Sequence, residues 1–79
     1  MKVEERLELR GEYIQLDQLL KAAGWVQSGG EAHAAISAGQ VRVDGQVETR
    51  RRAKLRADQQ VEWSGQRLVL CPPGQAADA

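Results

Sequence analysis

Two stretches of the chain repeat apolar residues three or four positions apart, the spacing of one face of an α-helix. The first repeat consists of Leu16, Leu19, Leu20 and Ala23, and the second of Ala32, Ala35 and Ile36. Gly24 and Gly39 follow the two repeats, and glycine readily ends a helix in the left-handed conformation. We therefore predict one helix over residues 16–23 and a second from Ser28 to Gly39. Their connection is so short that the helices must pack at an angle.

The second helix carries a start signal. Ser28 is followed three residues later by Glu31, the spacing of a capping box, in which each side chain accepts a hydrogen bond from the other residue's backbone amide. Gly29 and Gly30 stand between them, although glycine in a helix lowers stability relative to alanine. This cost suggests a close approach by another segment or by a ligand.

Elsewhere, apolar and polar residues alternate as in strands with one buried face. The alternation covers residues 3–10, 41–43, 61–63 and 68–70, and the charges of the first stretch favour the edge of a sheet. Tyr13 and Ile14 are expected to pack against the core. The prediction is an α+β fold in which two packed helices cover a small, mainly antiparallel sheet of about four to five short strands.

The dipeptide Asp44-Gly45 predicts a tight hairpin turn. A loop of only these two residues would place Val47 opposite Arg42, on the face away from Val43. A loop one residue longer would pair Val43 with Val47 and Arg42 with Glu48, and would bury the valines together. We favour the longer loop.

Length and composition favour one domain without an enclosed active site. A chain of 79 residues buries only about 60% of its unfolded surface. No nucleophile, base and orienting group are spaced as in a catalytic site, and the single Cys71 lacks the partners of a disulfide or a metal site. No apolar run is long enough to cross a membrane. We expect one domain over residues 1–71, a disordered tail over 72–79, a cytoplasmic location, and neither cofactor nor enzymatic activity.

Charge is balanced overall but unevenly distributed. The net formal charge is zero. Residues 1–20 carry three basic and five acidic side chains, whereas residues 40–67 carry seven basic and four acidic ones. Local charge, more than net charge, determines contact with phosphate. The uneven distribution therefore indicates a basic footprint in the second half of the chain.

Taken in order, residues 28–54 resemble a known family. The ordered set is Ser28-Gly29-Gly30-Glu31-Ala32, Ile36, Gly39, Val41, Val43, Asp44-Gly45 and a closing basic cluster. It is similar to the RNA-binding domain named after ribosomal small-subunit protein four, the S-four domain with its alpha-L motif. The layout resembles the small stand-alone bacterial members of the YbcJ type. The resemblance covers residues 16–70 and implies an L-shaped helix pair that binds structured RNA, with ribosomal RNA as the target class.

Two segments are the main candidates for RNA contact, namely the start of the second helix and the basic cluster. A guanidinium group can bind two phosphate oxygens at once and can stack on an unpaired base. The N-terminus of a helix attracts anions. The full candidate set is Ser28, Gly29, Gly30, His33, Arg42, Arg50, Arg51, Arg52 and Lys54. For two of these residues there is an alternative to RNA contact. His33 is then a solvated side chain without a ligand, and Arg42 forms an ion pair with Glu48. Trp25 and Trp63 are candidates for base stacking, but both fall at positions of the predicted core, and we place them there.

These observations predict a stand-alone, monomeric RNA-binding module that recognises phosphates and shape, with no membrane or small-molecule partner. The alternative is a protein–protein adaptor that keeps the fold and docks through its acidic N-terminal strand. That alternative is favoured by the zero net charge, by His33 and by the cluster of Glu4, Glu5, Glu8 and Glu12. The two hypotheses differ in salt dependence, because phosphate binding releases condensed counterions.

Overall fold

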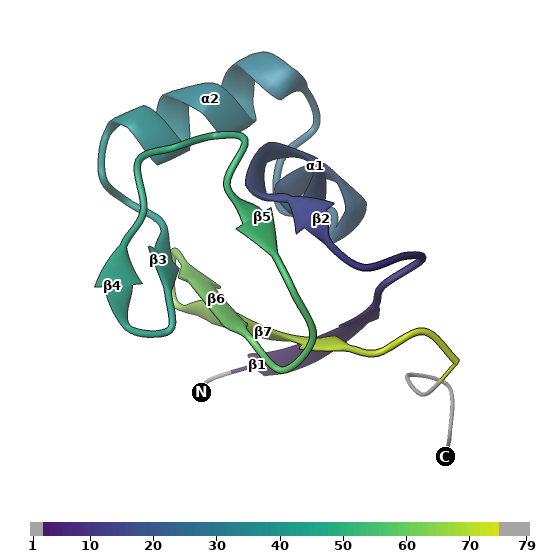
Figure 1. Ribbon diagram of the computed structural model, residues 1–79. Coiled ribbons are helices and arrows are strands. Elements are labelled where there is room, and N and C mark those ends of the chain that lie inside the picture. Colours follow the sequence, from purple (N-terminus) through teal and green to yellow (C-terminus); the bar gives the residue numbers. More distant parts are fainter. Residues whose placement is uncertain (1–2, 75–79) are drawn as a thin grey trace.

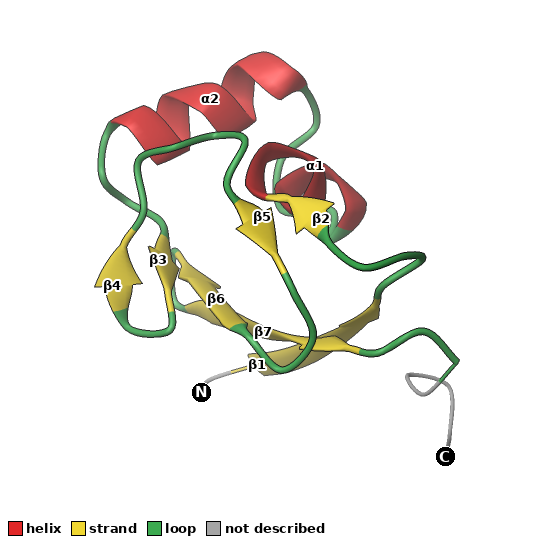
Figure 2. Ribbon diagram, in the orientation of Figure 1, coloured by secondary structure: helices red, strands yellow, loops and turns green. Residues whose placement is uncertain are grey.

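The computed structural model describes residues 3–74. Its two helices are α1 (Leu16–Ala22) and α2 (Gly29–Ser37). Its strands are β1 (Val3–Glu8), β2 (Ile14–Gln15), β3 (Arg42–Val43), β4 (Gln46–Val47), β5 (Lys54–Leu55), β6 (Gln60–Trp63) and β7 (Gln66–Cys71). The helices, with β2 and β5 beside them, lie on one side of the main sheet formed by the other strands (Figures 1 and 2).

The main sheet has the strand order β1-β7-β6-β3-β4, and β2 pairs with β5 in a separate two-stranded sheet. Three of the pairs in the main sheet are antiparallel, whereas β1 runs parallel to β7. The predicted α+β fold is confirmed, as is the edge position of the N-terminal strand. Alternation does not reveal the small sheet, because each of its strands has only two residues.

Both helices end as their glycines predict. Gly24 and Gly39 have φ angles of 77° and 75°, in the left-handed region where a Cβ atom is unfavourable. At the end of α2, the amide of Gly39 donates to the carbonyl of Ile36, and the amide of Gln40 donates to that of Ala35. The same two bonds recur at the end of α1. This is the Schellman arrangement, which satisfies carbonyls that the helix itself leaves unpaired.

The β3–β4 hairpin has the shorter loop, so the predicted register is wrong. Val43 pairs with Gln46 and Arg42 with Val47, which leaves the Val47 side chain 53% exposed. Asp44 and Gly45 both have positive φ, 52° and 84°, as a two-residue type I′ turn requires.

Long-range hydrogen bonds hold the Asp44 turn in place. Its carboxylate accepts bonds from the amide of Gln60 and from Nε2 of Gln59, each 3.0 Å long. The side-chain bond from Gln59 and then the backbone bond from Gln60 lower the pKa of Asp44 below its ordinary value. Alternation along β3 and β4 does not encode these contacts, which hold the two-residue loop in place.

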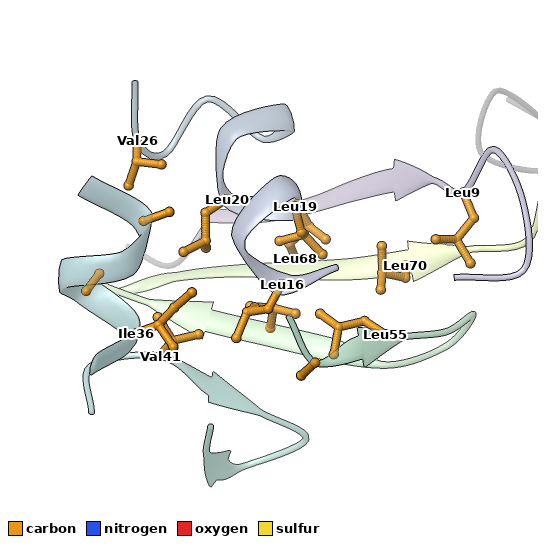
Figure 3. Close-up of a cluster of buried hydrophobic side chains, with 14 residues drawn as sticks. Leu9, Leu16, Leu19, Leu20, Val26, Ile36, Val41, Leu55, Leu68 and Leu70 are labelled. Atoms are coloured by element: carbon orange, nitrogen blue, oxygen red, sulfur yellow. The ribbon is translucent and has the colours of Figure 1, made fainter. Parts of the chain in front are cut away.

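A single apolar core lies between the helices and the main sheet (Figure 3). In the two predicted helical repeats, Leu16, Leu19, Leu20, Ala32, Ala35 and Ile36 are buried, as are Val61 and Leu68 of the predicted strands. Trp63 is only half-buried and packs against the core together with Trp25. The two indole rings lie 6.2 Å apart between centroids.

The segment before α1 departs from the prediction. Ile14 packs against the core as expected, but Tyr13 is 41% exposed, so its predicted burial is wrong. Ile14 lies opposite the buried Leu55 in the β2–β5 pair. Because neighbouring residues of a strand point to opposite faces, Tyr13 then points to solvent.

The last strand ends at Cys71, directly before Pro72 and Pro73. Residues 75–79 of the predicted tail lie outside the described residues. Over residues 3–74, the helices are too short and too polar for any of them to cross a membrane.

Candidate nucleic-acid interface

The basic segment, defined here as residues 50–54, leads from β4 into β5 on the helix side of the main sheet (Figure 1). Its four cationic side chains, those of Arg50, Arg51, Arg52 and Lys54, are exposed, whereas Ala53 is buried in the core. A buried alanine within a run of cations anchors the backbone while the charges stay in water.

Backbone hydrogen bonds attach the basic segment to the start of α1. The amide of Asp17 donates to the carbonyl of Arg51 over 2.8 Å, and the amide of Leu16 donates to that of Ala53 over 3.0 Å. The first amides of a helix have no partner within the helix, so the segment's carbonyls satisfy them. The cations therefore project from a fastened backbone.

One of the four cations is already paired. Nε of Arg50 lies 3.0 Å from the Glu48 carboxylate, and the Arg50 amide donates to the same carboxylate over 2.9 Å. The side-chain bond from Arg50 lowers the pKa of Glu48, and the same contact raises the pKa of Arg50. Within residues 3–74, Arg51, Arg52 and Lys54 form no ion pair. These three are the cations best able to meet an anion.

The second candidate segment is the start of α2. The Ser28 hydroxyl accepts a hydrogen bond from the Glu31 amide over 3.2 Å, as predicted. The Glu31 carboxylate, however, accepts its bond from the Gln27 amide over 2.7 Å, and not from Ser28 as the capping box would have it. The predicted bond from the Ser28 amide to the Glu31 carboxylate is thus replaced by one from the preceding residue, Gln27.

Gly29, Gly30 and His33 share the exposed side of this helix start. A Cβ atom added to Gly29 would meet no other atom within 4 Å, and one on Gly30 would meet only the Ser28 hydroxyl oxygen at 3.8 Å. Internal packing therefore does not require either glycine. His33 lies one turn after Gly30 and is exposed, which agrees with the predicted outward direction.

Arg42 lies apart from the other candidates. Val41 is buried and Val43 packs against the core, so Arg42 between them points from the sheet face that the helices leave uncovered. It pairs in register with Glu62, which in turn is bound by Arg67 over 2.9 Å. The alternative in which Glu48 pairs with Arg42 is wrong, because Glu48 binds Arg50.

Two further residues, Tyr13 and Arg56, lie on this surface beside Lys54 and were not among the predicted candidates. Nζ of Lys54 lies 4.9 Å from the ring centroid of Tyr13, and Cζ of Arg56 lies 6.0 Å from it. The signal was present in the alternation of Lys54 and Arg56 around the buried Leu55, which marks a strand with one cationic face. Among the described residues, no group of three His, Cys, Asp or Glu side chains is arranged to hold a metal ion.

The sequence profile of the S4 domain matches residues 7–70. The chain belongs to the S4 domain family. The match spans both helices and every strand from β2 to β6, so both candidate segments lie within the S4 domain.

Relatives of this S4 domain have been described in bacteria. "Putative RNA-binding protein YbcJ" of Escherichia coli (strain K12) is 51% identical over 53 residues, which are 67% of this chain and 76% of that protein. "Uncharacterized protein YbcJ" of Shigella flexneri has the same identity and coverage.

A solved structure has the same fold. The solution structure of YbcJ from E. coli, described as revealing an alfaL motif involved in RNA-binding, matches with a TM-score of 0.64 and 41% identity. The match covers 86% of this chain and 85% of that one. The helix pair α1–α2 predicted from the resemblance is thereby confirmed as part of this fold.

Proposed function

We propose that the protein is an RNA-binding module that recognises structured RNA through phosphate and shape contacts. The observation that carries the proposal is the basic segment, whose exposed cations project from a backbone hydrogen-bonded to α1. The name of the Escherichia coli relative and the description of the YbcJ structure support it. Ribosomal RNA is the target class favoured by the resemblance to the ribosomal protein domain.

Arg51, Arg52 and Lys54 are the proposed principal phosphate contacts, because none of them is neutralised by a carboxylate in the described part of the chain. Arg50 contributes less, because Glu48 compensates its charge. At the start of α2, Ser28, Gly29, Gly30 and His33 form a second contact, where first-turn amides attract an anion. Arg42 projects from the sheet face that the helices leave uncovered and acts as a peripheral contact.

The test is the salt dependence of RNA affinity. Each neutralised phosphate contributes a log–log slope of about −0.7 to −0.9. Three free cations therefore predict a slope of about −2 to −3 for a structured RNA hairpin, measured by fluorescence anisotropy of labelled RNA. A slope near zero, or no binding at low salt, contradicts the proposal.

The adaptor hypothesis is a distinct outcome of the same experiment. It predicts no RNA binding at low salt and a protein partner whose binding depends on the acidic residues of β1. The monomeric state and the cytoplasmic location remain expectations of the RNA-binding proposal, and size-exclusion chromatography and cell fractionation test them.

A further inference from the structure

The small β2–β5 sheet has two faces of different chemistry. Ile14 lies opposite Leu55, and Gln15 lies opposite Lys54. Leu55 is buried and Ile14 packs against the core, so this pair forms the inner face. Continuing the register by one residue places Tyr13 opposite Arg56, next to Lys54 on the outer face. The outer face of the small sheet is therefore cationic and carries an aromatic ring.

The Tyr13 ring is partly accessible and lies among positive charges. Its side chain is 41% exposed, with Lys54 Nζ at 4.9 Å and Arg56 Cζ at 6.0 Å from the ring centroid. Tyr13 and Val47 are the exposed large apolar residues of the described chain. Unlike Val47, Tyr13 combines an aromatic surface with cations that continue the basic segment along β5.

A hollow of about 610 Å³ adjoins Tyr13. Leu7, Ile14 and Ala22 give it apolar walls, while Arg10 and Gln18 supply polar groups. Glu8 also lines it, but its carboxylate accepts a hydrogen bond from the Gly74 amide. The hollow thus offers apolar surface beside the Tyr13 ring and one cation, Arg10, in its own lining, which suits a flat aromatic group attached to a phosphate.

We infer that Tyr13 is a stacking site for an unpaired base of the bound RNA, with Lys54 and Arg56 on the adjacent phosphates. This inference rests on the proposed function and specifies its ligand, namely a paired RNA element that carries an unpaired nucleotide. Bases within a duplex stack on one another and show no free face, whereas an unpaired base stacks on an aromatic side chain. The phosphates on either side of that base then meet Lys54, at the end of the basic segment, and Arg56, two residues beyond it.

The test compares two short RNA duplexes of two strands each, one fully paired and one with a single bulged, unpaired nucleotide, a 2-aminopurine that reports stacking through loss of fluorescence. Tyr13→Leu removes the ring and keeps apolar volume, whereas Tyr13→Phe keeps the ring. Val47→Ala, at the other exposed apolar position, is the matched control. Thermal melts establish that each variant is folded, which the exposure of both side chains leads us to expect.

Base stacking on one aromatic side chain changes affinity by about tenfold or more. We expect Tyr13→Leu to weaken binding of the bulged duplex by that factor, to leave binding of the fully paired duplex unchanged and to abolish the fluorescence loss. Tyr13→Phe and Val47→Ala should behave like the wild type. If Tyr13→Leu binds both duplexes as the wild type does, or weakens both equally, the stacking site is refuted while the proposed RNA-binding function stands. If the wild type binds neither duplex at low salt, both proposals fail together.

Discussion

The two helices of this small protein begin in different ways. At the start of α1, Gln15 provides no side-chain cap, and the amides of Leu16 and Asp17 donate to carbonyls of the basic segment. At the start of α2, the Ser28 hydroxyl accepts a bond from the Glu31 amide, and the adjoining glycines face open space. One helix start is closed by a distant part of the chain, and the other is closed by its own residues.

This difference separates a structural role from a binding role. The start of α1 holds the basic segment in place, so changes there alter the fold and the position of the cations together. At the exposed start of α2, the Ser28 hydroxyl takes up the Glu31 amide, which leaves the amides of Gly29 and Gly30 for an external anion. The following predictions test this contrast, beginning with the largest expected effect.

Loss of the Leu16 side chain should have the largest effect. Leu16 is the first residue of α1 and is fully buried. Leu16→Ala should lower the free energy of unfolding by about 2–5 kcal/mol, because it removes buried methyl groups and leaves a cavity. Urea denaturation measures this loss, with Val47→Ala as an exposed control. An unchanged midpoint would show that the start of α1 is not part of the core.

Charge reversal in the basic segment should weaken RNA binding without unfolding the protein. The Arg51 carbonyl, and not its side chain, binds α1, so the double variant Arg51→Glu, Arg52→Glu should retain its melting temperature. We expect RNA affinity to fall about ten- to a hundredfold, or about 1.4–2.8 kcal/mol, with a salt slope about one unit shallower for each lost contact. Arg6→Glu, at an exposed position on β1, serves as the control and should bind nearly as the wild type does. Equal losses in both variants would place the footprint elsewhere.

Removal of the Ser28 cap should have a moderate effect on stability. Ser28→Ala deprives the Glu31 amide of its acceptor and should cost about 1 kcal/mol. Ser28→Asn, which keeps an accepting oxygen, should recover most of that loss. Chemical denaturation of the three proteins measures the difference, and equal stability of the serine and alanine forms would argue against the cap.

A substitution at Gly29 should separate stability from binding. Because a Cβ atom there meets nothing within 4 Å, Gly29→Ala should raise the free energy of unfolding by about 0.4–1 kcal/mol through a less flexible unfolded chain. If a phosphate approaches this backbone, the added methyl group should also reduce RNA affinity. A more stable variant with unchanged affinity would remove the start of α2 from the interface.

The smallest expected effect concerns the pH dependence of the Glu48–Arg50 pair. Hydrogen bonding by Arg50 lowers the pKa of Glu48 in the folded state below its ordinary 4.5. This carboxylate therefore contributes stability above pH 4.5, and the contribution is lost as the pH falls through the lowered pKa. Glu48→Gln should reduce the acid sensitivity of the melting temperature slightly, since exposed pairs contribute little. An unchanged acid profile would mean that the backbone bonds alone position the segment.

Much of the candidate interface was predictable, because exposure follows from local pattern. The basic residues interrupt the apolar periodicity, and Ser28 and the two helix-ending glycines are recognised by residue type and spacing. Which candidate residues lie together in space was harder to predict from the sequence. Arg42 projects away from the helix layer because its neighbours Val41 and Val43 are drawn into the core. Tyr13 gains its place beside Lys54 and Arg56 only through the pairing of β2 with β5.

The sequence by itself determined the features that depend on a few neighbouring residues. These are the two helices and their glycine ends, the Ser28 cap, and the alternation of β6 and β7. Only the tertiary structure decided the parallel β1–β7 pair, the register of the β3–β4 hairpin and the attachment of the basic segment to α1. The physical reason is that backbone amides and carbonyls are alike at every residue. Which distant groups pair depends on the packing of the whole chain around its core.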